Sequence, residues 1–377
     1  MKVLHINSYY ATSGLFSNLY DRQMEDQIDI QVYVPMSKEF PEERVASKGT
    51  YTNNARVFNQ MDRIIFPLKH RKILADLKKN YTIPTFDLIH AHSLFSNGWL
   101  ARKLSEQYQI PYVVAVRNAD IRTFFQKMPW MRNSGLKTLL AAKQIIFISR
   151  NSYNEVFEKY IPSKYQECLK TKTLVLPNGI DDFWHEHTYQ RLNSKINSPI
   201  KVVSTGKVMG LKRFVQLSEM VEYYNQHFAP MELHIIGPNW NDKIAKTLQK
   251  SPVVTYHGSK SKEEILALYR QMDIFALLSS PETFGLVYVE AMSQGLPVIY
   301  TQGEGFDSFF ENYSIGVSVD KEDREGFYLA IDYIRQHYLE LTQACVNNIH
   351  PFNWDDIHQY YKQLYLSIIK EDLNEES

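Results

Sequence analysis

Residues 273–300 read DIFALLSSPETFGLVYVEAMSQGLPVIY, and the fold class follows from this stretch. Its opening residues are mostly apolar and predict a strand, after which a Pro-containing loop leads into a segment with helical spacing. Gly295 and Pro297 end that segment, and a second apolar run follows. A strand, a helix and a strand in this order form a βαβ unit, which joins two parallel strands. A helix that begins near Phe284 leaves the N–H groups of its first turn free, and these favour an anion such as phosphate.

The same alternation of short apolar runs and helical patterns extends along the rest of the chain. It predicts strands at 3–7, 30–34, 88–90, 112–116, 144–149 and 173–176, then one beginning at 201 and others at 232–236, 253–257, 274–278 and 297–300. The polar residues 183–199 show neither period and predict a linker. We therefore expect an α/β protein with doubly wound domains at 1–182 and 200–352, and a C-terminal helix with an acidic tail at 353–377.

The charge of the chain is balanced overall, at 42 Lys+Arg and 42 Asp+Glu, but its two halves differ in sign. Residues 1–180 hold 25 Lys+Arg against 15 Asp+Glu, and the remainder holds 17 against 27. Either the two domains have different partners, or a basic face of one meets an acidic face of the other. We expect no nucleic-acid partner.

Cysteine usage and the length of the apolar runs exclude other classes of protein. Cys168 and Cys345 occur without a CxxC pair or a nearby His cluster, which argues against a disulfide framework or a zinc site and favours a reducing cytoplasm. The first apolar run is shorter than a signal-peptide core. No run approaches the roughly 18 residues of a membrane span, so any membrane contact is expected to be peripheral.

Two glutamates mark the βαβ stretch. Glu282 precedes the predicted helix and Glu290 lies within it, separated by seven residues, so they do not form a side-by-side carboxylate pair. Because the two oxygens of a carboxylate can accept from two adjacent hydroxyls, Glu290 suits a ribose diol. The alternative is an ordinary acidic helix start, in which a glutamate caps the helix dipole.

PETFGLVYVEAMSQGLPV, with both glutamates, resembles the signature of the family 4 retaining glycosyltransferases. The resemblance implies the GT-B fold, in which two Rossmann-like domains face a cleft and a C-terminal helix crosses back to the N-terminal domain. It also implies a nucleotide-sugar donor in the C-terminal domain, with Glu282 at the hydroxyls of the donor sugar and Glu290 on the ribose. The backbone of the residues between them would face the diphosphate: Thr283, Phe284, Gly285, Leu286 and Val287.

Other stretches of the second domain extend this resemblance. STGKVMGLKRF is similar to the basic loop of the family, which implies that Lys207 and Lys212 contact the donor pyrophosphate, with Arg213 as an alternative in register. Lysine at the first position lacks the bidentate fork of the more common arginine. Gly237 in HIIGPN and Gly258 in TYHGSKSKEE resemble loops beside the nucleobase.

The N-terminal domain matches more loosely. Gly14 lies in a Ser/Thr/Gly loop similar to the glycine loop of the family under the diphosphate, and His90 and His92 follow a strand, as core or active-site residues. Arg117 occupies the position where many members carry a histidine. It could hold an anionic acceptor while Asp120 orients a hydroxyl, or the two could form an ion pair that braces the loop.

Residues 56–79 hold seven Lys+Arg among apolar side chains, against two aspartates. This composition is typical of a helix that lies on anionic lipid, and equally of a core helix with a solvated basic face.

The predicted activity is a retaining hexosyl transfer (EC 2.4 class). The expected donor is a UDP-sugar, and the expected acceptor is a polysaccharide, glycolipid or lipid-linked precursor of exopolysaccharide or other cell-envelope material. Glu282, Arg117, Asp120 and Lys212 are the candidate catalytic residues, and we expect no metal or other cofactor. The expected location is cytoplasmic, on the inner face of the plasma membrane. A non-catalytic nucleotide-sugar-binding protein and a nucleotide-sugar epimerase of the same fold are the alternatives, whereas a nicotinamide oxidoreductase is disfavoured because G-x-G-x-x-G does not follow the first strand.

Overall fold

The computed structural model describes residues 1–63, 65–192 and 195–376, and the chain divides into two compact units. The first unit comprises Met1–Ile148, Ser152–Pro177 and Trp354–Ser377, and the second comprises Ser149–Asn151 and Asn178–Asn353. Each unit contains one parallel sheet, which confirms the predicted α/β fold with two doubly wound domains. Ile64 of the basic stretch, residues 193–194 of the predicted linker and Ser377 of the predicted tail lie outside the described residues.

The first unit is built on a seven-stranded parallel sheet with the order β3-β2-β1-β4-β5-β6-β7. Its strands are β1 (Lys2–Ile6), β2 (Asp29–Ser37), β3 (Thr52–Phe58), β4 (Leu88–Ala91), β5 (Tyr112–Val116), β6 (Gln144–Phe147) and β7 (Thr173–Val175). Its helices are α1 (Ser17–Glu25), α2 (Phe66–Asn80), α3 (Ser96–Tyr108), α4 (Arg132–Ala141), α5 (Arg150–Lys159), α6 (Ser163–Lys170) and α14 (Trp354–Glu376). Every residue of β4 and β5 is buried, as expected for parallel strands covered on both faces.

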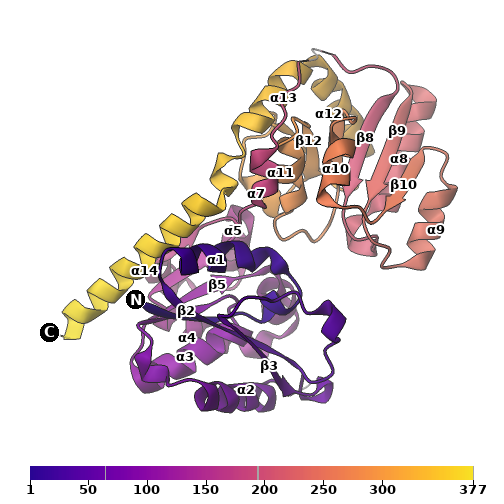
Figure 1. Cartoon of the computed structure of the whole chain (residues 1–377). Coiled ribbons are helices and arrows are strands. Elements are labelled where there is room, and N and C mark those ends of the chain that lie inside the picture. Colours follow the sequence, from indigo (N-terminus) through magenta and orange to yellow (C-terminus); the bar gives the residue numbers. More distant parts are fainter. Residues whose placement is uncertain (64, 193–194, 377) are drawn as a thin grey trace. The chain divides into compact units, whose positions relative to one another are not determined.

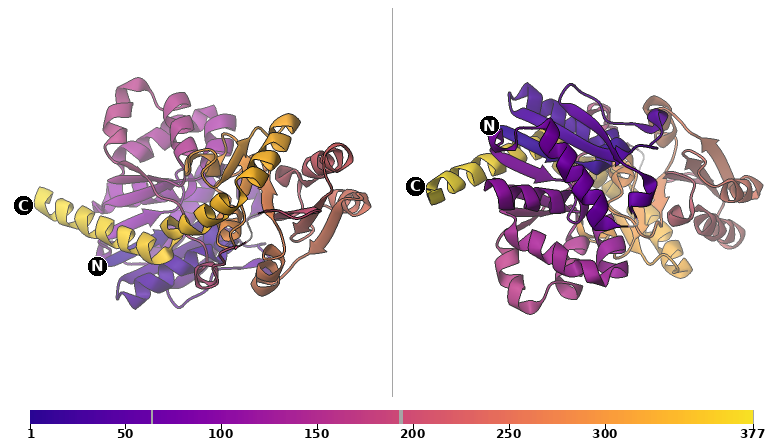
Figure 2. Two further views of the ribbon diagram at one scale, coloured as in Figure 1. Left: turned by 90° about the horizontal axis from the view of Figure 1, so that it is seen from above. Right: turned by 90° about the horizontal axis from the view of Figure 1, so that it is seen from below.

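Two hydrophobic cores lie on opposite faces of this sheet. Val3 packs on one face with α1 and α14, whereas Leu4 and Ile6 pack on the other with α2, α3 and α4 (Figure 1). This alternation is the period of two residues that a strand imposes on its side chains. Seen from above, the yellow α14 crosses one face of the sheet, and seen from below, the dark purple α2 covers the other (Figure 2).

The C-terminal helix α14 belongs to the first unit, in agreement with the predicted return to the N-terminal domain. Its buried residues recur at intervals of three or four, which makes one apolar stripe against α1: Trp354, Ile357, Tyr361, Tyr365 and Ile368. Asp26, just after α1, accepts hydrogen bonds from His358 and Lys362 on α14.

The second unit is built on a six-stranded parallel sheet with the order β10-β9-β8-β11-β12-β13. Its strands are β8 (Ile200–Thr205), β9 (Met231–Ile236), β10 (Val254–Gly258), β11 (Ile274–Leu277), β12 (Val298–Thr301) and β13 (Gly316–Val319). Its helices are α7 (Asp182–Glu186), α8 (Phe214–His227), α9 (Asp242–Lys250), α10 (Lys262–Tyr269), α11 (Leu286–Met292), α12 (Arg324–Gln336) and α13 (Tyr338–Asn347).

Two strands at sheet edges are additional to those predicted. β3 reads TNNARVF and β13 reads GVSV, so neither contains the long apolar run by which the other strands were recognised. An edge strand has one neighbour instead of two, and a polar or glycine-containing segment can therefore occupy it.

Residues 183–199, expected to be a linker, contribute packed structure to the second unit. α7 (Asp182–Glu186) extends into this segment, with the Asp181 side chain accepting from the amide of Phe183. Trp184 is buried and stacks on Tyr269 at 5.8 Å between ring centroids, and the Arg191 guanidinium donates to the carbonyl of Gln294. Although this segment is mostly polar, Trp184 and Arg191 thus fix it to the second unit.

Residues 56–79 do not form one basic amphipathic helix. Arg56 and Phe58 lie in β3, and α2 begins only at Phe66. Ile73 and Leu77 of α2 are buried in the core, which removes them from any lipid-facing surface. Among the described helices, none is both long and apolar enough to cross a lipid bilayer.

Candidate active site

The candidate site in the second unit forms around the start of α11, beyond the carboxyl end of β11. α11 begins at Leu286, two residues later than expected, because Gly285 adopts a left-handed conformation with φ of 86°. A Cβ atom at this position would lie 2.4 Å from the Tyr288 ring, so only glycine fits without displacement. The Tyr288 amide donates to the Gly285 carbonyl at 3.0 Å, whereas helix geometry gives the amides of Leu286 and Val287 no partner within α11.

Glu282 is held in a hydrogen-bonded network in the loop before α11. Its Oε2 accepts from Lys212 Nζ at 2.6 Å and from Ser279 Oγ at 2.7 Å, and its Oε1 accepts from the Thr283 amide at 3.1 Å. The side chains of Glu282 and Lys212 are 12% and 21% exposed, so the ion pair is shielded yet reachable from solvent. The structure therefore brings together two residues that lie 70 positions apart in the sequence.

Glu304, not singled out in the sequence, supports this network. Its two carboxylate oxygens accept from the Ser280 hydroxyl at 2.8 Å and from the Glu282 amide at 2.7 Å. Lys321 Nζ donates to the same Ser280 hydroxyl. The position of Glu304, in a glycine-containing loop directly after the predicted strand 297–300, was the available signal, because ligands of such sheets lie beyond strand ends.

Glu290 lies on α11, and Lys262 of α10 and Asp181 are the charged residues that affect its pKa. Its carboxylate is partly exposed, and none of the described residues donates a hydrogen bond to it. Burial raises the pKa of Glu290 to about 7; Lys262 opposes this shift and Asp181 adds to it. Lys262 itself pairs with Asp181, at 2.5 Å. An unpartnered carboxylate held in a poorly solvated position has acceptor capacity to offer a ligand.

The three cationic side chains of the basic loop after β8 have different partners. Lys212 faces Glu282, whereas the Arg213 guanidinium donates to the Lys321 carbonyl at 3.1 Å and pairs with Glu322 at 2.8 Å. Of Lys212 and Arg213, which the sequence left as alternatives, Lys212 is therefore the one that contacts Glu282. The exposed Lys207 lies over the Trp240 ring, with Nζ 4.1 Å from the ring centroid.

Three glycines lie next to one another at the carboxyl ends of β8, β9 and β10. A Cβ on Gly237 would lie 2.0 Å from the Gly206 carbonyl oxygen, and the Gly237 amide donates to the Gly258 carbonyl at 2.8 Å. Open space surrounds Gly258, whose φ is 69°. The backbone at this edge is thus closely packed at Gly237 and more open at Gly258.

In the first unit, Asp120 braces two loops. Its carboxylate accepts from the backbone amides of Leu94, Phe95 and Arg117 at 2.9–3.0 Å. Burial raises its pKa to about 6, although these amides and the Arg117 charge oppose the shift. Arg117 is buried, donates through Nε to the His92 carbonyl, and lies 5.5 Å from the centre of the Phe16 ring. The roles predicted for this pair toward an acceptor stay predictions.

The structure places His90 and His92 in the core, together with His5, which the sequence did not single out. Donor nitrogens of the three rings lie within 4.8 Å of one another, and burial lowers the pKa of each. His5 Nδ1 and His92 Nε2 are 3.1 Å apart, and His90 Nδ1 shares a hydrogen bond with the Tyr365 hydroxyl of α14. The charge of Arg117 adds to this lowering of the pKa at His90 and His92.

Gly14 lies at an exposed turn before α1. The nearest atom to a Cβ built there is 4.0 Å away, so the local backbone does not demand glycine. Its predicted approach to the donor stays a prediction.

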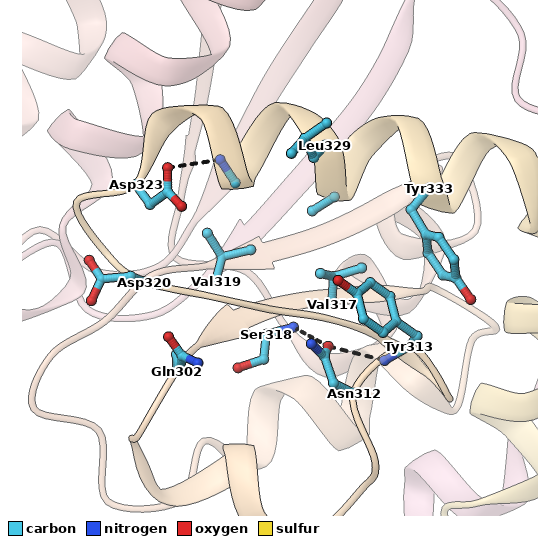
Figure 3. A pocket seen from close by; sticks show the side chains of 12 residues that line it. Gln302, Asn312, Tyr313, Val317, Ser318, Val319, Asp320, Asp323, Leu329 and Tyr333 are labelled. Atoms are coloured by element: carbon cyan, nitrogen blue, oxygen red, sulfur yellow. Dashed lines mark hydrogen bonds between the residues drawn. The ribbon is translucent and has the colours of Figure 1, made fainter.

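A cavity of about 630 Å³ lies apart from these glutamates, between β13 and α12 of the second unit (Figure 3). The Asn312 side-chain oxygen accepts from the amides of Tyr313 and Ser318, and the Asp323 carboxylate accepts from the Gly326 amide; dashed lines mark these hydrogen bonds in Figure 3. These polar groups serve the local turns and the start of α12. Glu282, Glu290 and Lys212 are not among the residues that line this cavity.

Comparison with known proteins identifies related glycosyltransferases. Residues 188–351 match the model described as glycosyl transferases group 1, and residues 16–182 match the model described as Glycosyltransferase Family 4. A D-inositol 3-phosphate glycosyltransferase of Corynebacterium kroppenstedtii is 22% identical, over 76% of this chain and 68% of its own. The alpha-monoglucosyldiacylglycerol synthase of Acholeplasma laidlawii is 25% identical, over 63% of this chain and 64% of its own. The structure of Anabaena Alr3699/HepE in complex with UDP and glucose has a TM-score of 0.68 at 18% identity, covering 97% of this chain and all of that one.

Proposed function

This chain belongs to the family 4 glycosyltransferases and is thus a transferase enzyme, and from that premise we propose that it moves a hexose from a UDP-sugar to a cell-envelope acceptor with retention of configuration. The observation that carries the proposal is the arrangement of Glu282, Lys212 and the free Glu290 around the start of α11. The complex of the similar Anabaena protein with UDP and glucose supports the choice of donor.

In the proposed donor complex, Glu290 accepts hydrogen bonds from the two ribose hydroxyls. Its carboxylate has no competing protein donor among the described residues, so a diol can use both oxygens. Gly258, where a Cβ would meet no atom within 4 Å, leaves room for the uracil ring at the end of β10, and Gly237 packs against Gly206 beside it. Glu282, oriented by Ser279 and Lys212, contacts hydroxyls of the hexose.

Catalysis then depends on stabilising the leaving diphosphate. As the bond between C1 of the hexose and the phosphate oxygen breaks, negative charge develops on the diphosphate, where Lys212, Lys207 and the first-turn amides of α11 stabilise it. The acceptor hydroxyl attacks C1 from the same face, its oxygen forms the new glycosidic bond, and its proton passes to the departing phosphate. This scheme needs no dedicated protein base, so an arginine at position 117 is compatible with it.

The proposed acceptor is a polysaccharide, glycolipid or lipid-linked precursor, and the proposed location is the cytoplasmic face of the membrane. The name of the Acholeplasma relative, a synthase of a glucosylated diacylglycerol, supports a glycolipid among these alternatives.

A panel of nucleotide sugars tests the donor, because a bound ligand raises the unfolding temperature by mass action. We expect UDP-sugars to stabilise the chain, and we expect Glu282→Ala to reduce transfer to a lipid-linked acceptor at least about a hundredfold while UDP still binds. If the wild-type chain and Glu282→Ala both bind UDP but show the same background level of transfer, the chain is instead a non-catalytic binding protein. Turnover of the donor without any acceptor would identify an epimerase.

A further inference from the structure

The first unit contains a cavity of about 770 Å³ whose lining comes from two kinds of element. Loops after β1, β4 and β5 contribute mostly polar residues, which include Ser8, Ser93, Ser96 and Asp120. The start of α2, the π-helix η6 (Asp120–Phe125) and the short helix η7 (Pro129–Met131) contribute mostly apolar residues, which include Ile65, Phe66, Phe124, Met128, Trp130 and Met131.

The polar part of the cavity lies where a substrate of this fold is expected. Ligands of open parallel sheets bind beyond the carboxyl ends of the strands, and the loops after β1, β4 and β5 are at this edge of the sheet. The hydrogen bonds that Asp120 accepts from Leu94, Phe95 and Arg117 hold two of these loops together. The edge is therefore preorganised by a buried carboxylate that belongs to the cavity wall.

The apolar part is a fixed aromatic wall. Phe124 stacks on Phe95 at 4.6 Å between ring centroids and meets Phe66 edge-on at 5.8 Å. Phe124 lies on a π-helix, a rare element that is frequently found at functional sites. Together these contacts hold a large apolar surface against the cavity.

The rim of the cavity exposes apolar side chains to solvent. Trp130 is 73% exposed and Ile65 is 54% exposed, although both line the cavity. Met128 and Met131 lie beside Trp130, and the flexible thioether side chain adapts its shape to a bound chain. Clustered exposed apolar residues at a cavity rim indicate a binding surface.

We propose that this cavity binds an amphiphilic acceptor, a saccharide attached to an apolar chain. The saccharide contacts Ser8, Ser93 and Ser96 at the strand ends, and the chain follows Phe124 and Trp130 outward. A free saccharide would leave the aromatic wall in contact with water, and the carboxylate of Asp120 is largely occupied by three backbone amides. The inference rests on the proposed function, because it is a hydroxyl of this saccharide that receives the hexose.

Binding of dodecyl β-maltoside, below the concentration at which it forms micelles, tests the proposal against binding of maltose. Both are titrated calorimetrically into the full chain and into Trp130→Ala, Ile65→Asn and Tyr360→Ala. Tyr360 is an exposed aromatic residue of α14 outside the cavity and serves as the matched control. The substituted side chains at 130 and 65 are largely exposed, so the variants should keep the wild-type unfolding temperature.

We expect the wild-type chain to bind the maltoside at least about tenfold more tightly than maltose, since a buried apolar chain adds favourable free energy. Trp130→Ala and Ile65→Asn should each weaken maltoside binding about fivefold or more, with Tyr360→Ala unchanged. Equal affinity for the two probes, or equal maltoside binding by all four proteins, would overturn the proposal. Titration of UDP into the same samples separates the two hypotheses: UDP binding without maltoside binding refutes only the acceptor cavity, and absence of UDP binding refutes the proposed function.

Discussion

Replacing Glu290 with glutamine should make the chain more stable and a weaker binder of its donor. Burial raises the pKa of Glu290 from 4.5 to about 7. An acid with a higher pKa in the folded state binds more protons there than when unfolded, so stability falls as pH rises from about 4.5 to about 7 and stays lowered above. At about 1.4 kcal/mol per pH unit, this rise corresponds to about 3 kcal/mol. Because the side chain is partly exposed, we expect solvent to reduce the cost to about 1–2 kcal/mol.

Glu290→Gln keeps the shape of the side chain and removes the ionised form. For a unit of this size, about 1–2 kcal/mol corresponds to an increase of roughly 2–8 °C in unfolding temperature. We expect this increase at pH 8 and a smaller one at pH 5, where the carboxyl is mostly protonated in the folded state but still mostly ionised in the unfolded chain. Loss of charge-assisted hydrogen bonds to the ribose, worth about 1.5–3 kcal/mol, should weaken UDP binding by roughly 10- to 150-fold.

Differential scanning calorimetry at pH 5 and pH 8, with and without UDP, measures both effects. Glu340→Gln is a matched control, because this glutamate lies on α13 of the same unit with its side chain 80% exposed. Two results would refute the reasoning: a lower unfolding temperature of Glu290→Gln at pH 8, or UDP affinity equal to that of the wild type.

Three further predictions concern the two units separately. Gly285→Ala should lower the free energy of unfolding by about 1–3 kcal/mol, because alanine is strained at a φ of 86°. Gly210→Ala should not lower it, because a Cβ there meets open space. Denaturant titration measures both variants, and equal effects would contradict the prediction. Lys212→Met should reduce kcat/KM by about 10²–10³. Arg213→Met removes a cation that is paired with Glu322, so it should reduce kcat/KM by less than about tenfold. A larger effect of Arg213→Met in steady-state kinetics would exclude Lys212 as the cation at the site. Burial lowers the pKa values of His5, His90 and His92 in the folded state only. Below about pH 6.5 the first unit should therefore lose up to about 1.4 kcal/mol of stability per pH unit for each of these histidines. Unfolding curves that do not change between pH 7 and pH 5 would contradict the assignment of neutral rings.

The candidate residues of the second unit could be predicted because they lie within one local pattern. Strand, loop and helix follow one another in residues 273–300, so the spacing of Glu282 and Glu290 already placed one glutamate before the helix and one on it. Helix termination at Gly295 is also local, since this residue adopts a left-handed φ of 65° just after α11. Such features depend on neighbours a few residues away, which a sequence displays directly.

Contacts between distant segments could not be predicted in the same way. The choice of Lys212 over Arg213 depends on which side chain the loop turns toward Glu282, and Glu304 reaches that loop from the end of a different strand. Trp184 is a core residue inside a segment whose composition indicated a linker. Each outcome is decided by packing between elements and not by local propensity.

The sequence by itself determined two parallel-sheet domains and the position of the stretch with Glu282 and Glu290 at a strand end, because hydrophobic periodicity and turn residues act over short distances. Only the tertiary structure decided that Asp120 serves three backbone amides, that three histidines share one core, and that Phe124 and Trp130 line the cavity proposed for the acceptor. These arrangements join residues from separate strands and helices. Their geometry exists only once the sheet has brought the strand ends to a common edge.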